Sequence, residues 1–205
     1  MKIGILGGTG RMGLGLARSY STAGHTVILG SRNPVQAHDA ANSLPISVHG
    51  GSLAEAARDG ELIVLAVPFS AGIDTVLAVQ QHLPEKIIID ITNPFGAVPA
   101  GQISGIEHNR EAAPTAKWVA AYKTTFWKTL ETPTNPGGLP RDVFVSAEDA
   151  EALATVMDLI ASTGFRAVDC GGFENARTLD LMVPLMIELD SRYRKDAGSS
   201  WKFLG

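Results

Sequence analysis

Short apolar runs alternate along the chain with longer segments in which apolar residues recur every three or four positions. The runs are rich in Ile, Val, Leu and Ala and lack polar alternation, which is typical of strands buried on both faces of a parallel sheet. The predicted strands span residues 2–6, 25–29, 46–48, 61–67, 86–91, 117–121, 142–146 and 165–169. The predicted helices span residues 10–23, 34–43, 53–59, 71–82, 147–163 and 174–192. This order predicts an α/β fold, a doubly wound and mostly parallel sheet of about eight strands with helices on both faces.

Several of the predicted helices begin with capping signals. Asn33 precedes Pro34, so this helix starts with a side chain that accepts from free amides and with a proline whose fixed φ suits the first turn. Ser52 and Glu55 have the spacing of a capping box, and residues 146–149 approximate one. Proline and glycine crowd residues 93–102 and 132–140, but strands and helices resume after each loop. We therefore expect one domain over residues 1–205 with a short C-terminal helical extension.

The last predicted helix is apolar on more than one face. Its main apolar face contains Leu179, Met182, Val183, Met186 and Ile187, and this face is widened by Leu181, Leu185 and Leu189. The helix either packs only against the sheet or also meets a second subunit. Pro184 removes one backbone donor, which predicts a kink.

Composition and charge exclude several classes of protein. Of the 205 residues, 45% are hydrophobic and 19% are charged, a balance that supports a globular core and excludes a disordered chain. The net charge of −4 argues against a nucleic-acid partner. A single cysteine excludes a disulfide framework, and the five scattered histidines lack metal-ligand spacing, so no metal is expected. Because neither a signal peptide nor a membrane-spanning apolar run is found, we expect a cytoplasmic protein with no membrane partner.

A glycine-rich segment follows the first predicted strand and opens the first predicted helix. It consists of Gly7, Gly8, Thr9, Gly10, Arg11, Met12 and Gly13. In this strand–turn–helix context the pattern is typical of a Rossmann-type dinucleotide site. The glycines permit a tight turn and let a pyrophosphate approach the backbone, while the helix N-terminus offers free N–H groups. The segment therefore predicts a nucleotide-binding domain.

The end of the second predicted strand indicates which dinucleotide binds. An NAD site places Asp or Glu there to bind the ribose hydroxyls, but this chain has Ser31 and Arg32. Ser31 can donate to a 2′-phosphate, and Arg32 can bind it through a charge-assisted fork. We therefore expect NADP(H); in the alternative, Ser31 helps to cap the next helix and Arg32 points to water.

Two families that bind nicotinamide cofactors do not fit. Short-chain dehydrogenases use Tyr-x-x-x-Lys, and none of the three tyrosines, Tyr20, Tyr122 and Tyr193, has a lysine four residues later. The β-hydroxyacid dehydrogenases continue into a long helical domain, whereas only 84 residues follow Ala121 here and two more strands are predicted among them.

The chain resembles the NADPH-dependent coenzyme F420 reductases, also called deazaflavin-dependent NADP oxidoreductases. The resemblance rests on residues 3–17, Gly24-His25, 30–32, Val67-Pro68, Asp90-x-Thr-Asn-Pro94, the helix from Arg177 to Pro184, and residues 201–204. It covers nearly the whole chain and is densest in the first half. The same domain is similar to the cytoplasmic part of the transmembrane metalloreductases, which pass hydride from NADPH to a flavin.

This resemblance implies where each ligand lies. Thr9, Arg11 and Met12 would face the pyrophosphate and nicotinamide, Ser31 and Arg32 the 2′-phosphate, and Val67 and Pro68 the edge of the nucleotide. Asn93 and Pro94 would lie where the nicotinamide meets a second ring. Archaeal members carry a histidine near the deazaflavin where this chain has Lys123. Lys123 either meets or protonates an anionic acceptor, or is an ordinary surface lysine at a strand end.

The resemblance also implies the reaction, a hydride transfer between the nicotinamide and a deazaflavin or flavin ring. Such a transfer depends on stacking at about 3–3.5 Å more than on an acid or base. Asn93 and Lys123 are therefore only candidates for a catalytic role. Two alternatives stay open: an NADPH-dependent reductase of a small imine or ketone, and an NADP-binding redox sensor without turnover.

Some residues near the expected site have structural interpretations. Asp90 is expected to cap the turn at 92–94, and Cys170 to be a small buried hydrophobe. Tyr122, Phe126 and Trp127 either belong to the core or form a stacking platform.

We also expect a homodimer, because in the resembling reductases the last helices pair across a two-fold axis. Leu181, Leu185 and Leu189 would lie in this interface. In the same proteins the C-terminal segment lies beside the acceptor pocket, so Trp201–Gly205 is expected there.

Overall fold

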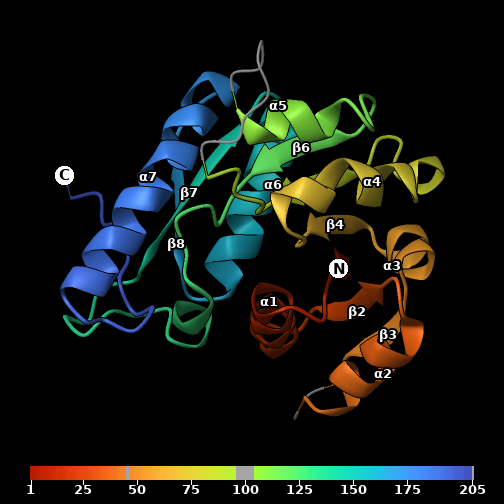
Figure 1. Cartoon of the computed structure of the whole chain (residues 1–205), viewed down its shortest axis with the longest axis horizontal. Helices are drawn as coiled ribbons and strands as arrows, with labels where there is room; N and C mark the ends of the chain where they lie inside the picture. The colour runs from red at the N-terminus through yellow and green to blue at the C-terminus, as the bar shows by residue number, and fades with distance from the viewer. Residues whose placement is uncertain (45–46, 96–103, 205) are drawn as a thin grey trace.

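The computed structural model describes residues 1–44, 47–95 and 104–204, which form one eight-stranded sheet in the order β3-β2-β1-β4-β5-β6-β7-β8 (Figure 1). The strands are β1 (Lys2–Leu6), β2 (Thr26–Ser31), β3 (His49–Ser52), β4 (Leu62–Leu65), β5 (Ile87–Asp90), β6 (Lys117–Ala120), β7 (Asp142–Ala147) and β8 (Arg166–Asp169). All neighbouring strands are parallel except β6 and β7. The strand order reverses at β1, which is where doubly wound sheets bind ligands.

Helices cover both faces of this sheet, as predicted. They are α1 (Arg11–Thr22), α2 (Pro34–Asn42), α3 (Leu53–Asp59), α4 (Gly72–Leu77), α5 (Gly105–Arg110), α6 (Ala150–Ser162) and α7 (Phe173–Arg192), with 3-10 helices η1 (Phe69–Ala71), η2 (Gln80–His82) and η3 (Trp127–Glu131). Residues of α1, α2 and α6 pack in one buried cluster, and residues of α3, α4, α5 and α7 pack in the other. Successive residues of β4 point to opposite clusters, with Leu62 and Val64 in the first and Ile63 and Leu65 in the second. This two-sided burial explains why the strands read as continuous apolar runs.

Two predicted helix starts are confirmed. Asn33 Oδ1 accepts from the amides of Val35 and Gln36 at 3.1 and 3.4 Å. In the capping box, the Glu55 amide donates to Ser52 Oγ at 3.1 Å and the Ser52 amide donates to Glu55 Oε2 at 2.7 Å.

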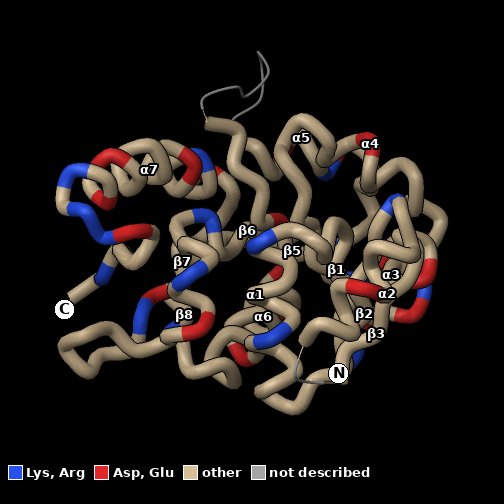
Figure 2. The backbone as a smooth tube through the Cα atoms, turned by 60° about the horizontal axis from the view of Figure 1, so that its bottom comes forward, with Lys and Arg blue, Asp and Glu red and all other residues tan. Residues whose placement is uncertain are grey.

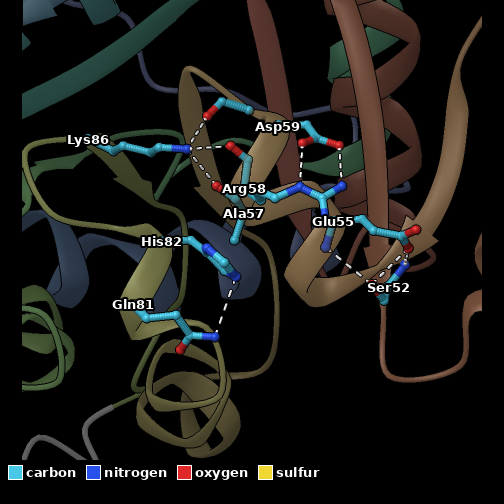
Figure 3. Close-up of polar contacts among 9 residues, drawn as sticks. Ser52, Glu55, Ala57, Arg58, Asp59, Gln81, His82 and Lys86 are labelled. Atoms are coloured by element: carbon cyan, nitrogen blue, oxygen red, sulfur yellow. Dashed lines mark hydrogen bonds and ion pairs between the residues drawn. The ribbon is translucent and has the colours of Figure 1, made fainter.

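The C-terminus of α3, the helix that begins with this capping box, is capped by the side chain of Lys86. Figure 3 shows Lys86, just before β5, reaching the end of α3. Its ammonium donates to the carbonyl oxygens of Ala57, Arg58 and Gly60 at 2.7, 2.9 and 2.7 Å. A cation at this position stabilises the carbonyls that a helix C-terminus leaves without partners.

The third predicted strand is wrong. It was placed at 46–48, where Ile46 lies outside the described residues, whereas β3 is His49–Ser52. The reason is glycine. A Cβ on Gly50 would lie 2.4 Å from the backbone of Ala37 in α2, so the close packing of α2 on β3 requires a residue that carries no strand signal.

Other boundaries also differ. The predicted helix 71–82 is divided into η1, α4 and η2, and neither α5 nor η3 was predicted. The approximate capping box at 146–149 is wrong: Ala147 belongs to β7, Asp149 caps α6 by accepting from the Ala152 amide at 2.8 Å, and the Ser146 hydroxyl donates to Gly172 O at 2.5 Å.

Acidic and basic residues are interspersed along α7 and the segment that follows it (Figure 2). Among the described residues, no helix has the length and apolar character needed to cross a membrane.

Candidate functional site

The glycine-rich segment turns sharply where β1 ends. Gly7 has φ +82°, and the amides of Gly7 and Gly8 both donate to Gly30 O, at 2.9 and 3.2 Å. A Cβ on Gly7 would lie 2.5 Å from Val67 Cγ1. The fold itself therefore requires glycine here, because the turn is left-handed and wedged between β2 and the end of β4.

Gly13 and Gly10 have different roles. A Cβ on Gly13 would lie 2.7 Å from Gly8 Cα, so α1 and the turn touch backbone to backbone. Among the described residues, a Cβ on Gly10 would meet only Gly7 O, at 3.6 Å, and Gly10 caps α1 with an extended φ of −79°. No described residue excludes a side chain at position 10. The open space beside it is where the free amides of α1 point.

A cavity of about 390 Å³ opens on one side of this turn. Its lining includes Gly7, Thr9, Gly10, Ser31, Arg32, Asn33, Gln36, Val67, Pro68 and Thr75. Ser31 is buried, its hydroxyl accepts from the Asn33 amide at 3.1 Å, and no described residue accepts the hydroxyl proton. Arg32 is exposed and forms no ion pair within the described part of the chain. The structure thus brings the residues predicted for the 2′-phosphate to one end of the cavity.

A second cavity of about 590 Å³ lies on the other side of the turn. Its lining consists of Gly10, Arg11, Met12, Ala66, Val67, Pro68, Phe69, Ser70, Ile91, Thr92, Asn93, Pro94 and Phe95. The two cavities share Gly10, Ala66, Val67 and Pro68, so they form one cleft that runs over the carboxyl ends of β1 and β4. Every predicted cofactor residue except Gly8 and Gly13 lines this cleft, and those two shape its turn.

Phe69, Ser70 and Phe95 of the second cavity were not predicted. They could have been predicted from their position, because they directly follow the predicted pairs Val67-Pro68 and Asn93-Pro94 in the sequence. Arg11 at this end lies over the Trp127 ring at 5.4 Å from its centroid, which holds the guanidinium beside the cleft.

Asp90 caps the turn after β5, as predicted. Its Oδ1 accepts from the Thr92 amide at 2.7 Å. Its Oδ2 accepts from Asn109 Nδ2 at 2.9 Å, and the same Nδ2 donates to Thr92 Oγ1 at 3.1 Å. Asn109, on the unpredicted α5, therefore holds the same turn from behind the cleft.

Lys123 is not an ordinary surface lysine. It is 2% exposed, and its ammonium donates to Thr92 O at 2.5 Å and lies 3.5 Å from Asp90 Oδ1 and 3.4 Å from Asp180 Oδ1. This geometry also differs from a lysine that meets or protonates an acceptor, because the side chain points behind the cleft wall. Lys123 is buried and not exposed because two buried carboxylates, those of Asp90 and Asp180, pair with its ammonium.

Asp180 on α7 completes this group and was missed by sequence reasoning. Its Oδ2 accepts from the Gly105 amide at 2.9 Å. Burial raises the pKa of the Asp180 carboxyl above its ordinary value, while Lys123 and the Gly105 amide act in the opposite direction. The sequence feature that could have identified Asp180 is its position as a carboxylate between the apolar residues Leu179 and Leu181.

The aromatic segment after β6 divides between core and surface. Tyr122, with φ +56°, is fully buried, and its ring meets Tyr20 edge-on with centroids 6.5 Å apart. Burial raises the pKa of the Tyr122 hydroxyl far above its usual range. Phe126 and Trp127 are half-buried. Cys170 is also only half-buried, so the prediction of a buried cysteine is wrong; partial burial raises the pKa of its thiol.

Residues 201–204 do not line the cleft, contrary to expectation, and Gly205 lies outside the described residues. Asp142 in β7 accepts from the Lys202 ammonium at 2.5 Å and from the Phe203 amide at 2.8 Å. Arg141 donates to Ser200 Oγ at 2.8 Å. The described residues after α7 are not helical, and these bonds hold them against the start of β7; the chain ends beside α7 (Figure 1). Among the described residues, no group of three or more His, Cys, Asp or Glu side chains is placed to hold a metal ion.

Comparison with known proteins places this geometry in a family. The family model described as NADP oxidoreductase coenzyme F420-dependent matches residues 2–94. The F420-dependent NADP reductase of Methanothermobacter thermautotrophicus is 32% identical over 97% of this chain and 93% of its own length. The metalloreductase STEAP3 of Rattus norvegicus is 27% identical over 91% of this chain but only 37% of its own length. A crystal structure assigned to the F420-dependent NADP reductases, from Arthrobacter sp. FB24, has a TM-score of 0.84 at 29% identity over 100% of both chains. The chain belongs to the family of F420-dependent NADP oxidoreductases.

Proposed function

We propose that this NADP-dependent oxidoreductase transfers hydride between NADP(H) and a second ring, a deazaflavin of the F420 type or a flavin. The observation that carries the proposal is the single cleft over Gly10. It has a polar end at Ser31 and Arg32, suited to a phosphate, and a largely apolar end between Met12 and Phe95. The relatives named F420-dependent NADP reductases support the same pair of ligands.

Different residues of the cleft would bind different parts of the nucleotide. The free amides at the start of α1 would bind the pyrophosphate, and Ser31 with Arg32 would bind the 2′-phosphate. Val67 and Pro68 lie in both cavities and would edge the nucleotide between them. The nicotinamide, when bound, supplies the hydride. The chain contributes position and exclusion of water, which is the chief requirement of a transfer between stacked rings.

Asn93 and Pro94 would lie where the two rings meet. Asn93 Nδ2 donates to Lys123 O at 3.1 Å, so its amide plane is fixed by the loop after β6. Pro94 is buried and presents an apolar surface to the same cavity. Asn93 is therefore proposed to orient the rings, and no residue of the cleft is assigned as acid or base.

An acceptor panel tests this function. Purified protein is mixed with NADPH and, in separate assays, with an F420-type deazaflavin, FMN, a quinone, a cyclic imine and a ketone, while the absorbance of NADPH is followed. Oxidation with the deazaflavin or FMN is expected. Oxidation with the imine or ketone alone would instead indicate the small-substrate reductase, and tight NADPH binding without oxidation would indicate a sensor.

We further propose that the protein is a homodimer, one domain per chain, that pairs through α7. Leu181 and Leu185 are 61% and 50% exposed on this helix, and Ile187 is also exposed. Leu189, the third residue predicted for the interface, is half-buried and lines a hollow with Met186 and Trp201. Sedimentation should give a dimer mass that Leu185→Asp lowers to that of a monomer, whereas a concentration-independent monomer in the wild type would contradict the proposal. The one unpaired cysteine fits a reducing, cytoplasmic compartment.

A further inference from the structure

A group of buried charges lies directly behind the second cavity. Asp90 is 0% exposed, Lys123 is 2% exposed and Asp180 is 5% exposed. The Lys123 ammonium lies between the carboxylates, at 3.5 Å from Asp90 Oδ1 and 3.4 Å from Asp180 Oδ1. The three residues come from the end of β5, the loop after β6 and the middle of α7, so the lysine joins three segments that are distant in sequence.

This group holds the wall of the cleft by its backbone. The Thr92 carbonyl accepts from Lys123 Nζ at 2.5 Å, and the Thr92 amide donates to Asp90 Oδ1 at 2.7 Å. Asn93, the next wall residue, donates from its side chain to the Lys123 carbonyl at 3.1 Å. Both wall residues are therefore fixed through contacts with Lys123, one to its ammonium and one to its backbone.

Stability alone does not account for charges at this place. Removing ionised groups from water is costly, and apolar side chains of similar volume usually fill such a space at least as well. The other wall contacts of the cleft, at Val67 and Pro68, involve no buried charge in the described part of the chain. The buried charges lie behind the wall where the proposed function places the meeting of the two rings.

We propose that Lys123 is a positioning residue for hydride transfer: with Asp90 and Asp180 it fixes Thr92 and Asn93, and through them the distance between the two rings. This inference rests on the proposed function. Its physical basis is the steep dependence of such a transfer on geometry, since a misplacement of about 1 Å can lower the rate about 100-fold. Affinity for NADPH depends mainly on the other end of the cleft and should change little.

The test uses a double variant, because Lys123→Met alone would leave two buried carboxylates without their cation. Lys123→Met with Asp180→Asn removes one positive and one negative charge and leaves Asp90 with its amide partners. Lys86→Met is the matched control: this lysine precedes β5, donates to three backbone carbonyls and lies at the opposite end of the strand from Asp90. Both variants lose a lysine that binds backbone carbonyl groups, but only the double variant alters the cleft wall.

Two readouts are expected to separate the variants. In the ligand-free protein, amide hydrogen exchange at Thr92 should be at least ~10-fold faster in the double variant and unchanged in the control. With saturating NADPH and acceptor, kcat should fall at least ~10-fold in the double variant, with a larger isotope effect from NADPH deuterated at the transferred position. The Kd for NADPH should stay within about twofold, because the phosphate contacts are untouched.

Three results would overturn the inference. The first is a folded double variant with wild-type kcat, and the second is unchanged exchange at Thr92. The third is an equal loss of kcat in Lys86→Met, which would indicate a general effect of stability. If neither the deazaflavin nor FMN supports oxidation of NADPH by the wild type, the proposed function itself fails, and the positioning role fails with it. That failure appears in the wild-type assay, before any variant is compared.

Discussion

Replacing Gly10 with valine should strongly weaken nucleotide binding without unfolding the protein. Gly10 has φ −79° and ψ 167°, an extended conformation that valine adopts readily. Within the described part of the chain, a Cβ at this position would meet only Gly7 O, at an ordinary 3.6 Å. The side chain would instead fill the space beside the free amides of α1, where the pyrophosphate is proposed to bind.

The two effects can be given magnitudes. Valine is a poorer N-cap than glycine, which costs about 1 kcal/mol, and the stiffer unfolded chain returns about 0.4–1 kcal/mol. The free energy of unfolding should therefore change by less than about 1 kcal/mol. A hydrogen bond to a charged group contributes about 1.5–3 kcal/mol, so losing two of them would weaken binding by at least about 3 kcal/mol. This corresponds to a rise of more than ~100-fold in the Kd for NADPH.

Calorimetric titration with NADPH and urea unfolding measure the two quantities on the same samples. Gly13→Ala provides the contrast, because its Cβ would lie 2.7 Å from Gly8 Cα and the backbone would have to shift. We expect that variant to lose roughly 1–3 kcal/mol of stability. An unchanged NADPH affinity in Gly10→Val would refute the placement of the pyrophosphate. A loss of stability as large as in Gly13→Ala would refute the argument that position 10 is kept open for a ligand.

Three further predictions concern single side chains. NADPH should bind more tightly than NADH by at least about 1.5–3 kcal/mol, and Arg32→Ala should remove most of this preference, whereas equal wild-type affinities would contradict it. Asn33→Ala should lower the unfolding free energy by about 1 kcal/mol, measured with urea, because two amides of α2 lose their acceptor. Burial by itself raises the pKa of Asp142, but hydrogen bonds from Arg166 and Lys202 outweigh it and hold that pKa below its ordinary value. Ionised Asp142 therefore stabilises the fold above about pH 4, and this stabilisation is lost as the pH falls through the lower folded pKa. The acid dependence of the unfolding free energy should be weaker in Asp142→Asn, and identical profiles would exclude this role.

The sequence predicted those parts of the fold whose determinants are local. Strands buried on both faces are apolar throughout, so β1, β4 and β5 were found from composition alone. Gly50 of β3 carries no such signal, because the close approach of α2 leaves no room for a side chain there. The division of residues 71–82 into α4 and two 3-10 helices was also missed, because short turns of either kind bury the same positions, such as Val76 and Val79.

The site divides in the same way. The turn from Gly7 to Gly13 and the pair Ser31–Arg32 are each contiguous in sequence, so local sequence alone predicts their place in the cleft. Asn109 and Asp180 lie on helices that are distant in sequence from the rest of the site. Their role depends on contacts with Asp90 and Lys123, which only the folded topology brings close to them. No spacing rule within one segment encodes such a contact.

Lys86 and Lys123 show that a lysine side chain has a different role at each edge of the parallel sheet. Both lie next to strand ends, Lys86 before β5 and Lys123 after β6. At the amino edge of a parallel sheet the crossover helices end, so the ammonium of Lys86 meets the free carbonyls of α3 (Figure 3). At the carboxyl edge lie the turns that border the ligand cleft, and there the ammonium of Lys123 meets the Thr92 carbonyl and two carboxylates. The lysine at the first edge stabilises the end of a helix, and the lysine at the second fixes the turn that borders the cleft.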